Sequence, residues 1–306
     1  MEQSFLAWLR GRGRTLPQVA IGIGDDAAVL DWPASRQLVT CVDTITDGVD
    51  FLIDQQPLDA IGHKALAVNL SDLAAMAADP VAAMVSISLP KQNATRVAAA
   101  IYEGILSTAK EFDVALCGGD ITCYDGPVSL SVTAIGSVQP GKAWLRSGAS
   151  VGEAVLVSGA LGGSILSKHL HFEPRIRLAQ SLRERFKVTS AIDISDGLLL
   201  DLDRLCAASS VGVELDLMNI PISDDARLLA GRHDGDPLRH ALGDGEDYEL
   251  IITCPANQLD GILHADVGVR LTHIGTLTSR TGLWSKLPNK VERLSPQGYV
   301  HGGANH

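Results

Sequence analysis

The sequence predicts a mixed α+β (α/β) fold arranged as two domains. Its 306 residues, 46 % hydrophobic and 20 % charged, are enough to bury a large core, and this length favours about two domains. Short apolar runs typical of strands alternate with longer runs of helical periodicity in both halves. The small, polar stretch RSGASVGE at 146–153 separates the halves. We therefore expect an N-terminal domain over 1–146 and a C-terminal domain over 147–306.

The first half contains the strands and helices of one α+β unit. Four segments have the apolar pattern of strands: 37–45, 82–90, 114–119 and 128–138. Two Ala-rich segments, 57–80 and 93–112, have the length and periodicity of helices, and Asn93 is the expected N-cap of the second.

The second half begins with a new apolar strand over 154–159. Its other clear strands are 190–195, 212–220, 248–254 and 270–277. The Gly-rich stretch Ser158–Ser164 (SGALGGS) follows the first of these strands. It fits either a tight turn or a backbone cradle for a phosphate, because glycine-rich turns serve both purposes.

Composition excludes several classes of protein. The formal charge of −11, with no run of Lys and Arg, argues against a nucleic-acid partner. No apolar run approaches the roughly 18 residues of a membrane helix, and the apolar residues of the first segment precede its arginines, the reverse of a secretion signal. Five cysteines without a C-x-x-C pair suggest reduced thiols rather than disulfides or zinc. We expect a cytoplasmic enzyme with no membrane partner.

Acidic residues beside Gly or Ser recur at the ends of the expected elements. The motifs are GDDAA, CVDT, NLSDL, CGGD, DISDGL and GDGEDYEL. One such aspartate is usually a turn former or helix cap, but six motifs together indicate a shared site. In the first motif, Asp25 and Asp26 follow glycines with dinucleotide-binding spacing, and they would repel a phosphate unless metal ions lay between.

Asp72 is the most informative of these acids. It lies at helical spacing from Ile61, Ala65 and Val68, so it shares an apolar face that should be buried. A buried carboxylate costs several kcal/mol unless it is paired or binds a metal, and no Lys or Arg follows Lys64 in this helix. Carboxylate oxygens are the ligands that Mg²⁺ prefers, together with water and substrate phosphates. The sequence thus predicts a magnesium-dependent phosphoryl-transfer site.

Several motifs, in chain order, resemble one known family over nearly the whole chain. They are GIGDDAAVL, VDTITDGVDF, HKALAVNLSDLAAMAADP, GGDIT, RSGA, IDISDGLLLDL and GEDYEL. The series resembles the thiamine-monophosphate kinases of the aminoimidazole ribonucleotide synthetase superfamily. That resemblance implies an aminoimidazole ribonucleotide synthetase-like fold whose N-terminal domains pair into a homodimer through a shared β-barrel. It also implies Mg²⁺-dependent transfer of the ATP γ-phosphoryl group to thiamine monophosphate, giving thiamine diphosphate and ADP.

The resemblance also assigns roles to residues of this chain. The aspartates expected to bind several Mg²⁺ ions are Asp26, Asp43, Asp72, Asp120, Asp193 and Asp196. The expected ATP contacts are Gly119, Asp120, Arg146 and Ser195. The expected catalytic residues are Asp72, Asp120 and Asp196. The positions expected to contact the acceptor are Asp50, Glu246 and Pro296.

The sequence departs from the family pattern at several of these places. Asp50 stands where a histidine is usual, and Pro296 where an aromatic residue precedes the late Gly-Tyr pair. Cys41 and Val42 replace the hydroxyl residues before Asp43. These departures leave two alternatives: a related kinase with another phosphorylated acceptor, or a non-catalytic nucleotide-binding subunit. The retained aspartates argue against the second, because unneeded carboxylates held together repel one another.

Overall fold

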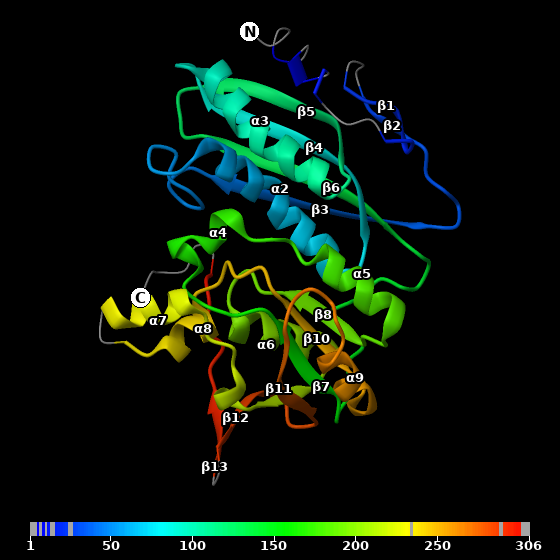
Figure 1. The fold of residues 1–306 in the computed structure, drawn as a ribbon, viewed down its shortest axis with the longest axis vertical. Coiled ribbons are helices and arrows are strands. Elements are labelled where there is room, and N and C mark those ends of the chain that lie inside the picture. Colours follow the sequence, from blue (N-terminus) through cyan, green and yellow to red (C-terminus); the bar gives the residue numbers. More distant parts are fainter. Residues whose placement is uncertain are drawn as a thin grey trace. The chain divides into compact units, whose positions relative to one another are not determined.

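The computed structural model describes residues 5, 8, 9, 11, 12, 16–23, 27–232, 235–287 and 290–300. The chain divides into two compact units (Figure 1). One comprises Met1–Leu73 and Ala78–Ala143, and the other comprises Ala74–Ala77 and Trp144–His306. We refer to them as the N-terminal and C-terminal domains. The predicted metal ligand Asp26 lies outside the described residues.

The N-terminal domain is built on a four-stranded sheet in the order β3-β6-β4-β5. Its strands are β3 (Gln37–Thr46), β4 (Asp79–Pro90), β5 (Ala115–Tyr124) and β6 (Ser129–Val138). Strand β6 is antiparallel to both β3 and β4, whereas β4 and β5 are parallel. A short antiparallel pair, β1 (Val19–Ile21) and β2 (Val29–Leu30), forms a separate ribbon. Strands β3 and β5 are therefore the two edges of the main sheet.

Two helices, α2 (Leu58–Ala75) and α3 (Ala94–Glu111), lie on the same side of this sheet (Figure 1). Helix α3 buries Val97, Ile101 and Ile105 at a spacing of four residues, the pattern of an amphipathic helix. The helices approach closely at a pair of glycines. A Cβ atom at Gly62 would lie 1.9 Å from the carbonyl oxygen of Ile101, and one at Gly104 would lie 1.8 Å from that of Asp59.

The C-terminal domain has a seven-stranded sheet in the order β13-β12-β9-β11-β7-β10-β8. Its strands are β7 (Ala154–Ser158), β8 (Ser190–Asp193), β9 (Gly212–Leu215), β10 (Leu250–Cys254), β11 (Leu271–Thr278), β12 (Gly282–Leu287) and β13 (Lys290–Leu294). Among the described strand pairs of this sheet, only β9 and β12 are parallel. Every residue of the neighbouring strands β7 and β10 is buried, so the core lies at this part of the sheet.

Helices and short 3-10 turns connect these strands. The helices are α4 (Lys168–His171), α5 (Ile176–Arg185), α6 (Leu198–Ser209), α7 (Asp224–Arg232), α8 (Pro237–Gly243) and α9 (Leu259–Leu263), and the 3-10 turns are η1 (Ser164–Leu166), η2 (Leu217–Asn219) and η3 (Ala256–Gln258). Helix α6 packs Leu198, Leu202 and Leu205 into the core. No helix in the described part of the chain is both long and apolar enough for a membrane span.

The structure confirms the mixed α/β content and corrects several boundaries. The strand predicted over 212–220 stops at Leu215, because Asp216 caps the 3-10 turn that follows by accepting a hydrogen bond from the Met218 N–H. Strand β5 continues to Tyr124, and the hairpin of β12 and β13 was not predicted. Asn93 occupies the N-cap of α3, but in a left-handed conformation without a side-chain capping bond.

Candidate active site

A buried asparagine, Asn69, links the strand that carries Asp43 to the helix that carries Asp72. Asn69 Oδ1 accepts the Asp43 backbone N–H at 3.1 Å, and Asn69 Nδ2 donates to the Ala65 carbonyl at 3.1 Å. The Cys41 thiol donates to the Asn69 carbonyl at 3.3 Å. Asn69 is completely buried, and Asp72 follows it by one turn of α2. These bonds fix the edge strand β3 against the helix that carries Asp72.

Negative groups crowd this part of the N-terminal domain. Burial, and then the charge of Asp50, raise the pKa of the Asp43 carboxyl. Burial also raises the pKa of the Cys41 thiol, and the charges of Asp72 and Asp43 and a hydrogen bond with Asp72 add to the effect. A divalent cation would relieve this repulsion, and carboxylate oxygens are its preferred ligands. The donor set therefore fits Mg²⁺, with Asp43 and Asp72 as the residues to hold it.

Asp50 shapes the turn that follows β3. Its Oδ2 accepts the Thr46 N–H at 2.7 Å, and its carbonyl oxygen accepts from Lys64 Nζ at 2.7 Å. Lys64 is completely buried in α2. One carboxylate oxygen of Asp50 is thus used inside the protein, which limits what this side chain offers to a ligand.

Gly119 and Asp120 lie on the other edge of the sheet, in β5. A Cβ atom at Gly119 would lie 2.0 Å from the Val85 carbonyl oxygen, so the strand pairing admits no side chain there. Asp120 is exposed, and its charge adds to burial in raising the pKa of Tyr102 on α3. Three strand spacings, about 14 Å, separate the β3 and β5 edges along the sheet. Asp120 is therefore not brought together with Asp43 within one chain.

The DISDGL motif forms a turn around a buried carboxylate. Asp201 Oδ2 accepts the backbone N–H groups of Ser195, Asp196 and Gly197 at 3.1, 2.9 and 3.1 Å. Arg204 Nη1 bonds Asp196 Oδ2 at 2.5 Å and Asp201 Oδ1 at 2.7 Å. Metal binding through Asp196 Oδ2 would therefore require the half-exposed Arg204 side chain to move aside. Sequence reasoning missed Asp201 and Arg204, although their spacing along one helix face could have indicated the pair.

Most of the predicted C-terminal site residues meet where β8 ends. The Glu246 N–H donates to the Ser195 carbonyl at 2.7 Å, and the Tyr299 N–H donates to the Asp196 carbonyl at 2.8 Å. Asp193 is the last residue of β8, and the exposed Pro296 lies three residues before Tyr299. The chain thus gathers the metal, nucleotide and acceptor candidates of this domain at one end of a strand.

Arg146 is the exception. Its carbonyl oxygen accepts from Ser190 Oγ at 3.0 Å, so its backbone lies beside the start of β8. Asp193 is three residues further along, roughly 10 Å at the rise of an extended strand. The Arg146 side chain is exposed and would have to extend along the strand to approach the others.

The Gly-rich stretch Ser158–Ser164 is a turn that binds carboxylates of its own chain. The Gly162 N–H donates to Asp247 Oδ1 at 2.8 Å, and the Gly163 N–H donates to Asp244 Oδ2 at 2.9 Å. These two amides are the groups that a phosphate cradle would have used. The structure therefore favours the turn over the phosphate site.

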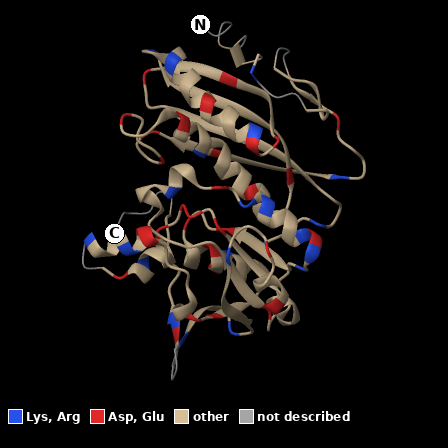
Figure 2. Ribbon diagram, in the orientation of Figure 1, with Lys and Arg blue, Asp and Glu red and all other residues tan. Residues whose placement is uncertain are grey.

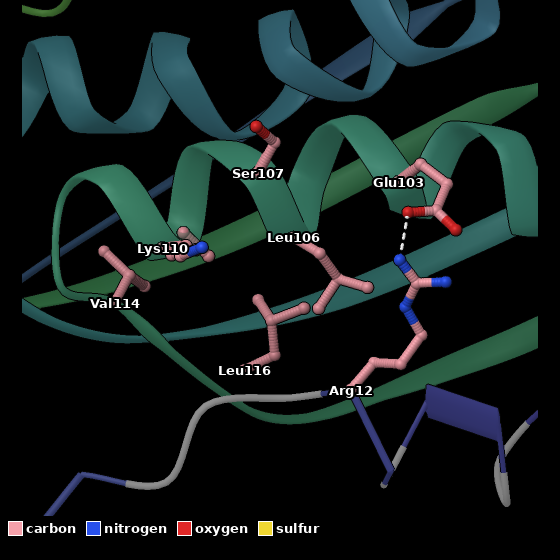
Figure 3. A pocket seen from close by; sticks show the side chains of 8 residues that line it. Arg12, Glu103, Leu106, Ser107, Lys110, Val114 and Leu116 are labelled. Carbon is pink, nitrogen blue, oxygen red and sulfur yellow. Dashed lines mark hydrogen bonds and ion pairs between the residues drawn. The ribbon is translucent and has the colours of Figure 1, made fainter.

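A cavity of about 420 Å³ lies on the outer side of α3 (Figure 3). Leu106, Val114 and Leu116 form its apolar wall, and Arg12 pairs with Glu103 at 2.5 Å across its rim. None of its lining residues belongs to the predicted site. Across the described chain, no three His, Cys, Asp or Glu side chains are grouped closely enough to hold a metal by themselves.

Comparisons with known proteins match both domains to known families. Residues 24–138 match the family AIR synthase related protein, N-terminal domain, and residues 144–284 match its C-terminal domain. The chain is 52 % identical to the thiamine-monophosphate kinase of Rhodopirellula baltica, with 99 % of this chain and 98 % of that protein covered. The chain belongs to the thiamine-monophosphate kinase family.

Solved structures support this membership in the thiamine-monophosphate kinase family. The kinase of Stenotrophomonas maltophilia K279a matches with a TM-score of 0.80 and 37 % identity, over 92 % of this chain and 94 % of that one. The structure of AaThiL complexed with AMPPCP and TMP matches with a TM-score of 0.78 and 27 % identity, over 91 % of each chain. The similarity covers both domains, so the family fold is present in full over the matched residues.

Proposed function

We propose that the protein is an ATP-dependent thiamine-monophosphate kinase, which transfers the γ-phosphoryl group of ATP to thiamine monophosphate and releases thiamine diphosphate and ADP. The observation that carries this conclusion is the similarity to such kinases over the full length of the chain. A relative of the same fold binds an ATP analogue together with TMP. Lys and Arg are interspersed with Asp and Glu along the chain (Figure 2), and the formal charge of −11 disfavours a nucleic-acid partner.

We propose that the reaction requires Mg²⁺ and that several ions bind. Bound Mg²⁺ would neutralise phosphate charge as the phosphoryl group moves between two anions. Asp43 and Asp72 would hold it in the N-terminal domain, with Asp26 and Asp120 as further ligands, while Asp193 and Asp196 would serve the C-terminal domain. Gly119, Arg146 and Ser195 are the proposed nucleotide contacts, and Asp50, Glu246 and Pro296 the proposed acceptor contacts.

We also propose a cytoplasmic homodimer in which the two N-terminal sheets close into a barrel. The sheet face away from α2 and α3 exposes Leu38, Val42 and Met84 by 53, 61 and 37 %, and a second sheet could cover these apolar side chains. Each of the edge strands β3 and β5 also has one side that pairs with no other strand among the described residues, and closure of a barrel would pair that side. Pairing β3 with the second copy's β5 would place Asp43 near Asp120 of the partner subunit.

Turnover of defined substrates tests the activity. Purified protein with ATP, Mg²⁺ and thiamine monophosphate is expected to form thiamine diphosphate and ADP in equal amounts, and excess EDTA is expected to stop the reaction. Full turnover in EDTA would overturn the metal requirement. Turnover of another phosphorylated compound in place of thiamine monophosphate would favour the related kinase, and ATP binding without any turnover would favour the binding subunit.

Mixing two inactive variants tests the shared site. If Asp43 and Asp120 act from different subunits, a heterodimer of Asp43→Asn and Asp120→Asn contains one intact pair. After subunit exchange, about a quarter of wild-type activity should return, because half of the dimers are mixed and half of their sites are intact. Absence of recovery, with mixed dimers confirmed by mass, would place both residues of each site in one chain.

A further inference from the structure

Three features that cost free energy are concentrated in three consecutive residues of the GEDYEL motif. Glu246 and Tyr248 both have positive backbone φ angles, 54° and 49°, which side-chain-bearing residues rarely adopt. Between them, Asp247 is buried, and its Oδ2 has no hydrogen-bond partner among the described residues. Such features persist where the surrounding structure enforces them, and they are typical of functional sites.

The Gly-rich turn provides the enforcing contacts. Asp247 Oδ1 accepts the Gly162 N–H at 2.8 Å and the Ser164 hydroxyl at 2.7 Å. The residues on either side of Asp247 bond to the chain leaving β8: the Glu246 N–H to the Ser195 carbonyl, and the Tyr248 N–H to the Ile194 carbonyl at 2.8 Å. The loop is thus attached on both sides, with the Asp247 carboxylate as its central anchor.

Tyr248 and Glu249, which follow Asp247, are held by side-chain contacts of their own. Glu249 is held by Arg175 in two hydrogen bonds of 2.7 Å and by Lys168 at 2.8 Å. The Phe172 and Tyr248 rings are stacked with centroids 3.9 Å apart. Glu246, in contrast, is half-buried, so it is the member of the motif that keeps access to solvent.

We infer that Asp247 is a positioning residue for acceptor binding: anchored on the Gly-rich turn, it holds Glu246 in the left-handed conformation from which Glu246 contacts the acceptor. This inference rests on the proposed function, in which Glu246 is an acceptor contact. Asp247 itself touches neither substrate. The Gly-rich stretch then has a role in acceptor recognition without contacting a phosphate.

Substitutions at both ends of the anchor test the inference. Asp247→Ala is expected to raise KM for thiamine monophosphate by about tenfold or more, and Ser164→Ala by about threefold. Neither variant is expected to change KM for ATP much. Asp247→Asn keeps the accepting Oδ1 and is expected to retain a KM near the wild-type value. Ser164→Ala keeps the test decisive if Asp247→Ala does not fold.

Hydrogen exchange supplies a readout that does not depend on substrate. The amide hydrogens of Glu246 and Tyr248 should exchange faster in Ser164→Ala than in the wild type. In Asp247→Asn they should exchange at the wild-type rate. Unchanged exchange in Ser164→Ala, or faster exchange without a change in KM for thiamine monophosphate, would overturn the inference. If the wild-type protein does not use thiamine monophosphate, the proposed function fails instead, and exchange still shows whether Asp247 anchors the loop.

Discussion

The two domains use their acidic residues in different ways. In the N-terminal domain, Asp43, Asp50 and Asp72 act on one another or on Cys41 as like charges, and they raise the pKa values of their neighbours. In the C-terminal domain, Asp201, Asp247 and Glu249 are each about 1 % exposed, and each accepts hydrogen bonds from N–H groups, hydroxyls or basic side chains, with Asp247 accepting them through Oδ1 alone.

We interpret this difference as a division between carboxylates that shape the backbone and carboxylates that are proposed to bind a cation. A carboxylate satisfied within the protein fixes the conformation of the segment around it, and its removal costs stability. Carboxylates that repel one another lower the free energy of unfolding. A cation that binds between them raises it again. Variants of the two groups should therefore affect different measurements.

The largest effect on stability is expected from the buried ion pair of the C-terminal domain. Arg175→Met leaves the Glu249 carboxylate short of its two-bond partner and should cost about 3–5 kcal/mol of unfolding free energy, measured by denaturant titration. Arg177→Ala is the matched control, because Arg177 is 61 % exposed and pairs with Glu173 at 3.3 Å on the surface. That control should cost less than about 0.5 kcal/mol. Equal losses of unfolding free energy in Arg175→Met and Arg177→Ala would contradict the structural role of the buried Arg175–Glu249 pair.

The pH dependence of stability should reveal Asp247. Burial raises its pKa from 3.8 to about 6, against the opposing effects of Lys168, Ser164 and Gly162, while Glu249 adds to the increase. Since the unfolded chain loses this proton first, the group should lower the unfolding free energy as pH rises from about 4 to 6, by roughly 3 kcal/mol. The stability of Asp247→Asn relative to the wild type should therefore increase between pH 4 and pH 7. If the difference in unfolding free energy between Asp247→Asn and the wild type did not change with pH, the raised pKa of Asp247 would be contradicted.

In the N-terminal domain, Asp72→Asn should reduce turnover and leave the fold intact. The amide keeps the shape of the side chain but lacks the charge for a metal, so kcat should fall at least about 100-fold while thermal stability changes little. The same change removes a negative charge beside Cys41, so its thiol should alkylate faster at pH 8. Peptide mass spectrometry after brief alkylation measures this second effect. If Asp72→Asn turned over at the wild-type rate, Asp72 would be a structural residue and not a metal ligand.

The smallest effect is expected at the acceptor position Pro296. The sequence predicts weak binding of thiamine monophosphate because Pro296 cannot provide an aromatic surface for the cationic thiazolium ring. Pro296→Trp should lower KM about two- to fivefold, with kcat nearly unchanged. Combining Pro296→Trp with Asp50→His is less suitable, because Asp50→His would remove the carboxylate that accepts the Thr46 N–H. A higher KM in Pro296→Trp would favour a different acceptor.

Much of the fold could be predicted because long apolar segments dominate it. Strands 37–45 and 128–138 match β3 and β6 within a residue at each end, since both have strong periodicity and clear flanking turns. The hairpin of β12 and β13 was missed because both strands, GLWSKL and KVERL, are short and interrupt their apolar residues with charged ones. Its strand identity comes from pairing with β9, which no local pattern shows.

The candidate site was predictable in its residue types but not in its contacts. The recurring Asp and Gly motifs indicated Asp43, Asp72 and Asp193 without a structure. They could not show that Asp196 pairs with Arg204, or that Asp43 and Asp120 lie on opposite edges of one sheet. Pairings across such distances in the chain depend on topology, which one sequence without relatives does not specify.

The crossing of α2 and α3 at Gly62 and Gly104 has a consequence for how this enzyme can vary through evolution. Usually a larger side chain at one position in a core can be accommodated by a smaller one at its neighbour. Here each glycine faces the backbone of the opposite helix, whose carbonyl oxygens would lie only 1.9 and 1.8 Å from an added Cβ atom, so neither neighbour has a side chain to shorten. Gly104→Ala therefore has no compensating partner at position 62. We expect the two positions to be independently invariant among functional relatives rather than to covary.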